Sequence, residues 1–515
     1  MLASAMRYGF VIDQDRCIGC HACTVACKEE HNVPIGVFRT WVKYIEKGEF
    51  PDASRHFGVM RCNHCDAAPC VEICPTTSLY RRDDGIIDFD SARCIGCKSC
   101  MQACPYDALY LDPNSHTAAK CNYCAHRVEQ NLEPACVIVC PTQAIITGDL
   151  DDPQSTIAAL VATQKVVSRK PHKGTEPKLF YKGIDGDLLQ PTMPARTASH
   201  FWADRGDAAE FAALAASPDA RRSSGASRVV YEVAHRAPWG WRIGAYLFTK
   251  SIGAGAILIA ALMLTLGYRS DLLLMGFGAP ALAMVFVTLT AILLIADLKR
   301  PERFYFLLTK PNPSSWLVIG GWILMAFGGL AFLWFASAWF AGLPPPIVVW
   351  LGALLAIAAA CYTGFLFAQA KGRDLWQSPL YTWHLLIQAA VAGAAILTLA
   401  GAFTGISPDT ILALGNTLAI AMALSLAMIL AEVYLPPPGK EVELATDLLT
   451  VGALRGRFWG GALGLGIVAP IILIALAERV GAAPAFEMLA AALGLLGVWM
   501  FEELWVRAGQ AAPLS

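Results

Sequence analysis

Charge is scarce in this sequence, and the two signs nearly cancel. Only 16% of the 515 residues are charged, and the formal net charge is -1. No overall basic field is present to attract nucleic acid, so we expect no nucleic-acid partner. The stretch MLASAMRYGFVIDQDRC also lacks an apolar core of signal-peptide length and a twin-arginine pair. We therefore expect no export signal on this chain itself, although a partner that carries one could export it.

Cysteine is nearly missing after Cys140, where Cys361 alone remains. The other sixteen cysteines lie between Cys17 and Cys140. Long apolar runs have the opposite distribution, because nearly all of them follow Trp241. With 56% hydrophobic residues, the chain is too apolar for an ordinary soluble protein. We therefore predict a cysteine-rich domain followed by a membrane domain.

The sixteen cysteines fall into four groups of four. The groups are Cys17, Cys20, Cys23 and Cys27; Cys62, Cys65, Cys70 and Cys74; Cys94, Cys97, Cys100 and Cys104; and Cys121, Cys124, Cys136 and Cys140. At four thiolates per cubane they match four [4Fe–4S] clusters with none left over. A tight C-x2-C-x2-C loop reaches three corners of a cubane, and a fourth cysteine further on serves the other cluster of a pair.

Zinc and disulfides are the alternative interpretations of these groups. Structural zinc sites usually have two C-x2-C pairs separated by a longer loop, and the third closely spaced cysteine in two of the groups argues against them. Disulfides require an oxidising compartment and a small scaffold, and they do not call for this repeat. The spacing favours iron–sulfur clusters.

The cysteine-rich part also resembles a known family. YGFVIDQDRC and GIIDFDSARC are echoes of one unit, which indicates a duplicated ferredoxin. Residues 7 to about 190 resemble the four-cluster ferredoxin subunits of membrane-bound molybdenum oxidoreductases, such as dimethyl sulfoxide, polysulfide and nitrate reductases and formate dehydrogenases. The stretch beginning GDLDDPQS after the last group is similar to theirs too. The resemblance implies an α+β double-ferredoxin-like fold.

In that family the first group exchanges its last ligand with the fourth group, and the second with the third. The ligand sets implied here are Cys17, Cys20, Cys23 and Cys140; Cys121, Cys124, Cys136 and Cys27; Cys62, Cys65, Cys70 and Cys104; and Cys94, Cys97, Cys100 and Cys74. The resemblance also implies a line of clusters whose last member is nearest the membrane.

Eight apolar stretches are long enough to cross a bilayer. They lie at about 241–268, 272–297, 316–342, 346–370, 378–402, 410–435, 458–478 and 483–507. Residues 191–229 are rich in Ala, Ser, Pro and charge and are typical of a linker. We therefore expect a cluster domain over 1–190, a linker over 191–229 and a membrane domain over 230–515.

An even number of spans places both ends of the membrane domain on one side. The twelve basic residues of that side are Arg236, Arg242, Lys299, Arg300, Arg303, Lys310, Lys371, Arg373, Lys440, Arg455, Arg457 and Arg507. The other side has only Arg269 and Arg479. The positive-inside rule then predicts a multi-pass protein of the bacterial inner membrane with a cytoplasmic cluster domain. A periplasmic cluster domain is the alternative, because basic residues near clusters also serve docking or quinone binding.

Ionisable residues inside the spans are costly and mark candidate sites. Lys250, Asp297, His384 and Glu432 all fall in the half of the membrane nearest the cluster domain. A purely structural role, such as a pairing of Lys250 with Asp297 or Glu432, is the alternative for each of them. The opposite half has mainly Asn416 and Glu487, so we expect no polar path across the bilayer.

A second resemblance covers most of 230–515. The stretches YEVAHRAPWGWRIGAYLF, DLKRPERFYFLLTKPNPSSW and YTGFLFAQAKGRDLWQSPL resemble the NrfD-type, polysulfide-reductase-like membrane subunits. The resemblance implies an all-α domain of eight transmembrane helices in two four-helix bundles, with a quinone (menaquinone or ubiquinone) bound among the first four helices and no haem. His384 is the single histidine inside the spans, which agrees with the absence of haem. By position His235 and Tyr362 are the implied quinone contacts, while Lys250 stands where many relatives have a small residue.

Together these features predict an electron-transfer and quinone-reactive subunit of a respiratory oxidoreductase. Lys250, Asp297 and Glu432 are then candidates to supply or take protons at the quinone. The substrate of the other half-reaction would bind a separate catalytic subunit of the molybdopterin type. Two alternatives remain: a redox-driven ion-translocating module, which predicts a polar path to the far side, and an electron-transfer subunit of a hydrogenase, which predicts a nickel–iron partner.

Overall fold

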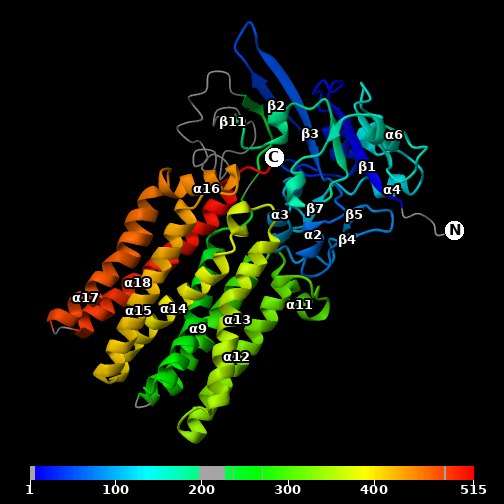
Figure 1. Cartoon of the computed structure of the whole chain (residues 1–515). Coiled ribbons are helices and arrows are strands. Elements are labelled where there is room, and N and C mark those ends of the chain that lie inside the picture. The colour runs from blue at the N-terminus through cyan, green and yellow to red at the C-terminus, as the bar shows by residue number, and fades with distance from the viewer. Residues whose placement is uncertain (1–5, 197–226, 236, 269–270, 481–482) are drawn as a thin grey trace.

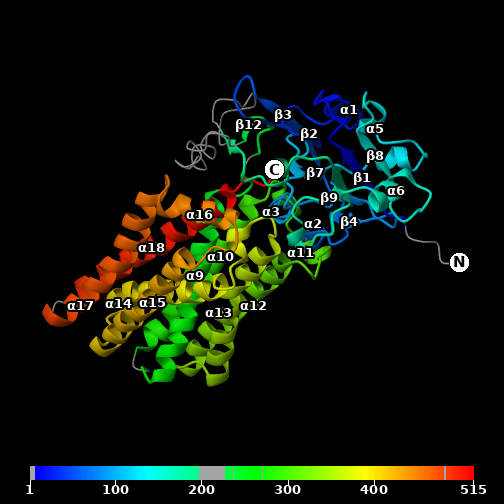
Figure 2. The ribbon, with the colours of Figure 1, turned by 45° about the horizontal axis from the view of Figure 1, so that its top comes forward.

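The computed structural model describes residues 6–196, 227–235, 237–268, 271–480 and 483–515. A domain of short strands and helices occupies the N-terminal part, and long helices form the rest (Figure 1). The N-terminal domain lies against one end of the helices in both views (Figures 1 and 2). We call this end of the helices the near end and the opposite one the far end. The predicted fold class is confirmed.

Two four-stranded sheets organise the N-terminal domain. Their strands are β1 (Tyr8–Asp13), β2 (Thr40–Lys47), β3 (Ser54–Arg61), β8 (Ile145–Asp149), β9 (Val166–Val167), β10 (Leu179–Lys182), β11 (Ala195–Arg196) and β12 (Arg228–Tyr231). One sheet has the order β8-β1-β10-β9, in which β1 pairs parallel with β10 and antiparallel with β8. The other sheet has the order β11-β12-β2-β3. The sheets thus join the start of the domain to its end.

The second sheet also crosses the expected domain limits. Most of the expected linker, residues 197–226, lies outside the described residues. Its two described ends are strands, because β11 pairs parallel with β12 and β12 pairs antiparallel with β2. The expected boundary between 229 and 230 therefore falls inside a strand of the cysteine-rich domain.

Short elements carry the cysteines between the sheets. Two hairpins are formed by β4 (Leu79–Arg81) with β5 (Ile87–Phe89) and by β6 (Leu109–Leu111) with β7 (Ala118–Lys120). The short helices are α1 (Ala22–Glu30), α2 (Pro69–Glu72), α3 (Ser99–Ala103), α4 (Ala125–Val128), α5 (Ala135–Ile138), α6 (Thr156–Thr163), η1 (Pro171–Lys173) and α7 (Gly186–Leu189). Cysteines lie within α1, α2, α3 and α5.

In the described part of the chain, eight helices are long and apolar enough to cross a membrane. They are formed by α9 (Trp241–Leu266), η3 (Leu273–Gly278) with α10 (Ala279–Asp297), α12 (Trp316–Ala341), α13 (Pro346–Gln369), α14 (Tyr381–Thr404), α15 (Pro408–Tyr434), η6 (Gly456–Val468) with α17 (Ala469–Val480), and α18 (Ala483–Ala511). Four shorter helices lie on the side of the near end: η4 (Pro301–Arg303), α11 (Phe306–Thr309), η5 (Asp374–Gln377) and α16 (Lys440–Thr450). The eight predicted spans are confirmed as helices.

Glycines decide how closely the long helices approach. A side chain at Gly255 of α9 would lie 2.7 Å from the Gly393 nitrogen of α14 and closer still to the Ala389 carbonyl oxygen. These two helices therefore touch backbone to backbone in mid-span, as small residues allow in membranes. Gly267 and Gly405, with φ of +100° and +65°, end α9 and α14 at the far end. The crossing joins the first four spans to the last four.

Candidate metal centres and the buried polar residues of the membrane domain

All four cysteine groups use the same local turn. The second residue after the first cysteine of each group has a positive φ: +70° at Gly19, +45° at His64, +69° at Gly96 and +63° at Tyr123. This left-handed conformation suits glycine and costs energy for other residues. It lets backbone N–H groups turn toward the sulfur atoms, as from His64 to Cys62 and from Gly96 to Cys94.

Two of these turns hold a bulky residue in the strained conformation, and its side chain is anchored. The His64 ring accepts a hydrogen bond from the Ile87 backbone N–H at 3.2 Å. The Tyr123 hydroxyl donates to the Gly9 carbonyl oxygen at 2.6 Å. Both side chains are buried. The surrounding strands therefore maintain a turn that these two side chains would disfavour in isolation.

Folding brings the last cysteine of each group beside the early cysteines of another group. Cys140 lies within electrostatic range of Cys17, and Cys27 within range of Cys121 and Cys124. The same exchange joins the second and third groups, since Cys104 neighbours Cys65 and Cys70, and Cys74 neighbours Cys94 and Cys97. Four sets of four thiols result.

The chemistry of these sets fits a cluster better than a single ion. Burial raises the pKa of the Cys23 and Cys104 thiols to about 11 and of the Cys97 and Cys124 thiols to about 12. Several buried thiolates in one place therefore need a positive partner. A single zinc ion requires ligands about 2.3 Å from one point, whereas no three His, Cys, Asp or Glu side chains among the described residues can hold one ion. Cubane ligands bind separate irons and lie further apart.

Polar groups around the sulfurs complete the sites. Buried Arg61 donates through Nη1 to the Cys136 sulfur at 3.2 Å and also lies near Cys23 and Cys121, so it stands between two of the sets. His31 places Nε2 3.1 Å from the Cys124 sulfur. Burial lowers the pKa of His31 to about 4, so the ring is neutral at physiological pH and donates when Nε2 carries the proton.

The four sets extend from the surface to the membrane domain. Cys20 is exposed at the outer end, and Cys17 and Cys140 are half-buried there. At the inner end the loop around Cys94 and Cys97 touches the membrane domain. Arg303 donates to the Cys94 carbonyl oxygen at 2.9 Å, and the Trp239 indole donates to the Cys97 carbonyl oxygen at 3.2 Å.

Asp297 belongs to this contact. It ends α10, and its carboxylate accepts a hydrogen bond from the Lys98 ammonium at 2.7 Å. Lys98 lies between Cys97 and Cys100. Backbone N–H groups of Lys299 and Arg300 bond the carbonyl oxygens of Gly96 and Ile95 nearby. The structure therefore brings Asp297 to the innermost cysteine loop.

Lys250 and Tyr362 lie together among the first four spans. The Lys250 ammonium donates to the Ala360 carbonyl oxygen and to the Thr363 hydroxyl, both at 2.8 Å. It also lies 5.0 Å from the centre of the Tyr362 ring. Lys250 on α9 is thus held by two bonds to α13. Asp297 and Glu432 were the possible partners of Lys250 in the structural alternative. In the structure Asp297 bonds Lys98, and Glu432 bonds His384.

Glu432 lies in the other half of the membrane domain. Its carboxylate stands 3.3 Å from His384 Nδ1 and accepts from the Ser378 hydroxyl at 3.3 Å. His384 Nε2 lies 3.3 Å from Gln388 Nε2 and 3.4 Å from the Ser425 hydroxyl. The structure therefore places Glu432 in a buried polar group that is separate from the Lys250–Tyr362 contact.

His235 lies before α9 at the edge of the cysteine-rich domain. Its Nδ1 is 2.7 Å from the Asp107 carboxylate, and its ring centre is 5.1 Å from that of Trp41. Among the described residues, no hydrogen bond or ring contact joins His235 to Tyr362. The two residues that the family resemblance suggested therefore have different surroundings.

Sequence reasoning missed several residues that the fold places here. Lys98 looked like an ordinary residue of a cysteine loop. Glu502 lies in α18 and is fully buried. A signal for Glu502 was present, because FEELW puts two carboxylates near the end of an apolar span.

The chain resembles known proteins in both of its parts. Residues 229–513 match the family described as "Polysulphide reductase, NrfD", and residues 16–79 and 54–150 match 4Fe-4S dicluster domains. The B subunit of the tetrathionate reductase of Salmonella typhimurium is 42% identical over 36% of this chain and 76% of its own length. The B chain of the polysulfide reductase of Wolinella succinogenes is 42% identical over 34% of this chain and 94% of its own length.

A third relative is the iron–sulfur subunit ArrB of the arsenate respiratory reductase of Shewanella sp., which is 35% identical over 34% of this chain and 96% of its own length. These relatives cover the cysteine-rich part, while the NrfD match covers the membrane part. The chain is therefore a multi-pass membrane protein of the NrfD polysulphide reductase family that carries, on the same polypeptide, an iron–sulfur electron-transfer domain with 4Fe-4S clusters.

Proposed function

We propose that this chain conducts electrons between a separate catalytic subunit and a quinone in the membrane through four [4Fe–4S] clusters. The observation that carries this proposal is the course of the cysteine sets. The four sets form a row whose outer end is exposed at Cys20. At its inner end, the carbonyl oxygens of Cys94 and Cys97 accept hydrogen bonds from the membrane domain. Clusters, when bound, supply electron transfer one electron at a time.

The sixteen cysteines would hold these clusters in the four exchanged sets. From the outer end inward they are Cys17, Cys20, Cys23 and Cys140; Cys27, Cys121, Cys124 and Cys136; Cys62, Cys65, Cys70 and Cys104; and Cys74, Cys94, Cys97 and Cys100. The repeated left-handed turn supports this assignment, because it directs backbone N–H groups toward ligand sulfurs, as at Cys62 and Cys94.

An exposed apolar surface at the outer end supports docking of a catalytic subunit there. Ile18, Val25, Ile138 and Val139 are 40–65% exposed and lie within three residues of Cys17, Cys23 or Cys140. Large apolar side chains gathered on one face mark an interaction site. The named relatives are reductase subunits, and a molybdenum or tungsten pterin enzyme is the partner class we propose.

The quinone would bind among the first four spans, beside the inner cysteine loop. Tyr362 and Lys250 are the residues proposed to contact it or exchange protons with it, and both are buried at the near half of the spans. His235 is proposed to contribute from the edge of the site, where Asp107 orients its ring. Asp297 would hold the inner loop in place, and Glu432 would take part in proton exchange. We propose no haem.

The cluster domain is proposed to face the cytoplasm. By the order of the spans in the sequence, twelve Lys and Arg residues fall on the side of the cluster domain and two on the other side, although Arg236 and Arg269 among them lie outside the described residues. The side chains of Arg303 and Arg373 bond the cluster domain, at the Cys94 carbonyl and at Gln102. Arg303 and Arg373 therefore help to dock the cluster domain onto the membrane domain. The excess of basic residues on the cluster-domain side remains when these two residues are left out of the count.

A quinone assay on the purified complex tests this function. The matched variants are Tyr362→Phe in the proposed site and Tyr434→Phe at the exposed end of α15. Tyr362→Phe should lower turnover with a short-chain menaquinone and a short-chain ubiquinone about tenfold or more, while dithionite-reduced cluster spectra stay unchanged. Tyr434→Phe should retain the wild-type rate. Full activity of Tyr362→Phe, or a purified chain with far fewer than sixteen irons, would contradict the proposal.

A further inference from the structure

Glu502 of α18 is a buried acid that has no hydrogen-bonding partner among the described residues. Its side chain is fully buried, and neither carboxylate oxygen is hydrogen-bonded within the described residues. The next residue differs, because Glu503 binds Arg457 and Arg507. An ionisable group inside a span is costly and is retained where it has a function.

The helices packed around α18 present ionisable groups to Glu502. Helices α9 and α18 run in opposite directions, with Gly244 against Glu503 and Phe248 against Trp499. Tyr246 of α9 therefore lies at the level of Glu502, and Lys250 lies more than one turn further along α9 toward the far end. Both are within electrostatic range of Glu502.

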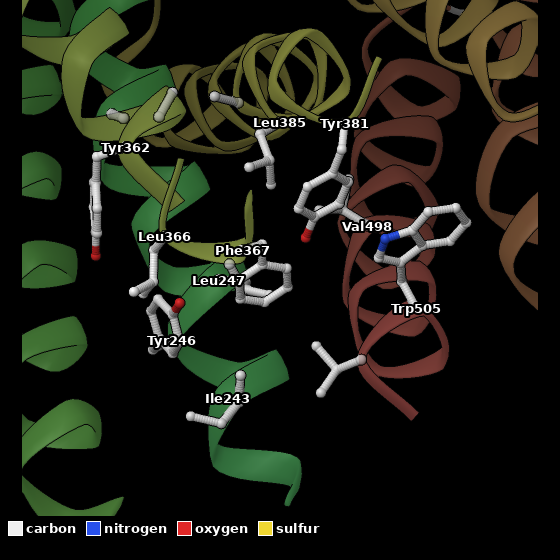
Figure 3. Packing of buried hydrophobic residues seen from close by; sticks show 14 of the residues in the cluster. Ile243, Tyr246, Leu247, Tyr362, Leu366, Phe367, Tyr381, Leu385, Val498 and Trp505 are labelled. Atoms are coloured by element: carbon white, nitrogen blue, oxygen red, sulfur yellow. The ribbon is translucent and has the colours of Figure 1, made fainter. Parts of the chain in front are cut away.

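Helix α14 contributes Tyr381, which is also within range of Glu502. Its ring stacks on Trp505 at 5.9 Å, one turn from Glu502 along α18. Figure 3 shows Tyr381 on the side of Trp505 of α18, and Tyr246 beside Leu366 of α13. Glu502 thus faces titratable groups from two other helices.

A purely structural ion pair does not explain Glu502. The Lys250 ammonium makes its two hydrogen bonds to Ala360 and Thr363 of α13, and none to Glu502. A buried ion pair stabilises a protein only when its geometry and additional hydrogen bonds offset the loss of hydration. Glu502 therefore lies within electrostatic range of Lys250 without being hydrogen-bonded to it.

Tyr381 is the next titratable group beyond Glu502 in the direction of the near end of the spans. Its hydroxyl is buried without a hydrogen-bond partner in the described part of the chain, and it lies within electrostatic range of both Glu502 and Glu432. Glu432 is two residues from the end of α15, where Tyr434 is exposed, and it bonds half-buried Ser378. These groups therefore end at Glu432, whose side chain is buried two residues before the near end of α15.

In the other direction the polar groups stop inside the membrane. Gln388 and Ser425 border a cavity of about 10 Å³, whose other lining residues are apolar or glycine. That volume is at the limit for one water molecule. The backbone contact of Gly255 with Gly393 closes α9 on α14 at mid-span. The described groups therefore lead to one face only.

We propose that Glu502 relays protons between Glu432 and Tyr381, which are buried close to the near end of the spans, and the quinone site at Lys250 and Tyr246. The inference rests on the proposed quinone function. Reduction of a quinone to a quinol takes up two electrons, which arrive through the clusters, and two protons, which enter by this route. Oxidation of a quinol reverses both flows. A relay is needed because the proposed quinone site is buried. Each carboxyl or phenol group transfers a proton only over a short distance, so several groups must act in sequence.

The test compares two glutamates of the same helix in the full complex. Glu502→Gln removes the titrating group but keeps its shape, and Glu487→Gln does the same at a buried glutamate in the far half of α18. Glu502→Gln should lower turnover with a short-chain quinone at least tenfold, increase the solvent deuterium isotope effect and shift the pH profile. Quinone affinity and the dithionite-reduced cluster spectra should remain those of the wild type. Glu502→Asp should restore part of the rate.

A second measurement reports on Glu502 independently of turnover. Redox-difference infrared spectra of the wild type should contain a carboxyl band that Glu502→Gln removes and Glu487→Gln retains. A wild-type rate and pH profile in Glu502→Gln would overturn the relay, and so would the survival of the band. Equal slowing by Glu502→Gln and Glu487→Gln would also overturn the relay, because it would indicate a proton path that reaches the far half of the membrane. A wild type that reduces no quinone, although its clusters are reduced, would overturn the proposed function instead.

Discussion

The Lys98 ammonium lies 2.7 Å from the Asp297 carboxylate and joins the innermost cysteine loop to the second span. Both side chains are about nine-tenths buried. The same stretch of chain donates backbone N–H groups of Lys299 and Arg300 to the loop. The pair therefore holds the loop against the spans at the place where the cluster domain meets the membrane domain.

Loss of this ion pair should weaken the docking. Asp297→Asn leaves the Lys98 ammonium buried without its counter-charge, so we expect a loss of about 3 kcal/mol of stability and slower quinone turnover. Thermal bleaching of cluster absorbance measures the stability. The double variant Lys98→Gln with Asp297→Asn removes both charges and should recover most of it. If the double variant is as unstable as Asp297→Asn, the buried unpaired charge of Lys98 is not the cause of the lost stability.

Arg61 should raise the reduction potential of the two outer cluster sets. Its charge lies near Cys23, Cys121 and Cys136, and a buried cation favours the form with the extra electron. A charge at roughly 8 Å contributes about 2 kcal/mol at an effective dielectric constant of about 20, and 1.4 kcal/mol corresponds to about 59 mV for one electron. Arg61→Gln should therefore lower two potentials by on the order of 50–100 mV.

Redox titration followed by electron paramagnetic resonance measures these potentials. Arg55→Gln is the matched control, because Arg55 lies on the same strand, is exposed and pairs with Glu46. The control should leave all four potentials unchanged. Unaltered potentials in Arg61→Gln, or equal shifts in both variants, would contradict the prediction.

The crossing of α9 and α14 should tolerate no side chain at Gly255. A Cβ atom there would lie 2.7 Å from the Gly393 nitrogen and nearer still to the Ala389 carbonyl oxygen, so the helices must separate. We expect Gly255→Ala to cost about 1–3 kcal/mol, the usual range for overpacking. Unfolding in detergent measures the change.

Gly321→Ala in α12 is the control for the glycine crossing. Nothing lies within 4 Å of a Cβ atom at Gly321, and alanine favours a helix more than glycine does. This variant should therefore be at least as stable as the wild type. Equal stability of the two alanine variants would mean that the crossing is not tightly packed.

Local patterns in the sequence predicted much of the architecture. Cysteine spacing and eight long apolar runs depend on neighbouring residues alone, so the cysteine-rich domain and the eight helices could be predicted. The exchange between Cys27 and the fourth group required the family resemblance, because about a hundred residues separate its members. The left-handed turns at His64 and Tyr123 had no glycine to indicate them.

Partners of the buried charges were harder to predict. A pairing of Lys250 with Asp297 or Glu432 is the structural alternative that the sequence leaves open for residues of one depth in the membrane. Depth follows from the position along a helix, whereas a partner depends on which helix faces flank each other. Asp297 instead bonds Lys98 from the other domain, and Glu432 bonds His384.

The sequence alone determined how many thiols are available for clusters and which segments are apolar enough to enter a membrane, because composition and spacing are local properties. Only the tertiary structure decided that Glu502 faces Tyr381 and the Lys250 side of α9, and that the innermost cysteine loop meets the near ends of the spans. These relations depend on the rotation and crossing of packed helices, which no single stretch of the chain encodes.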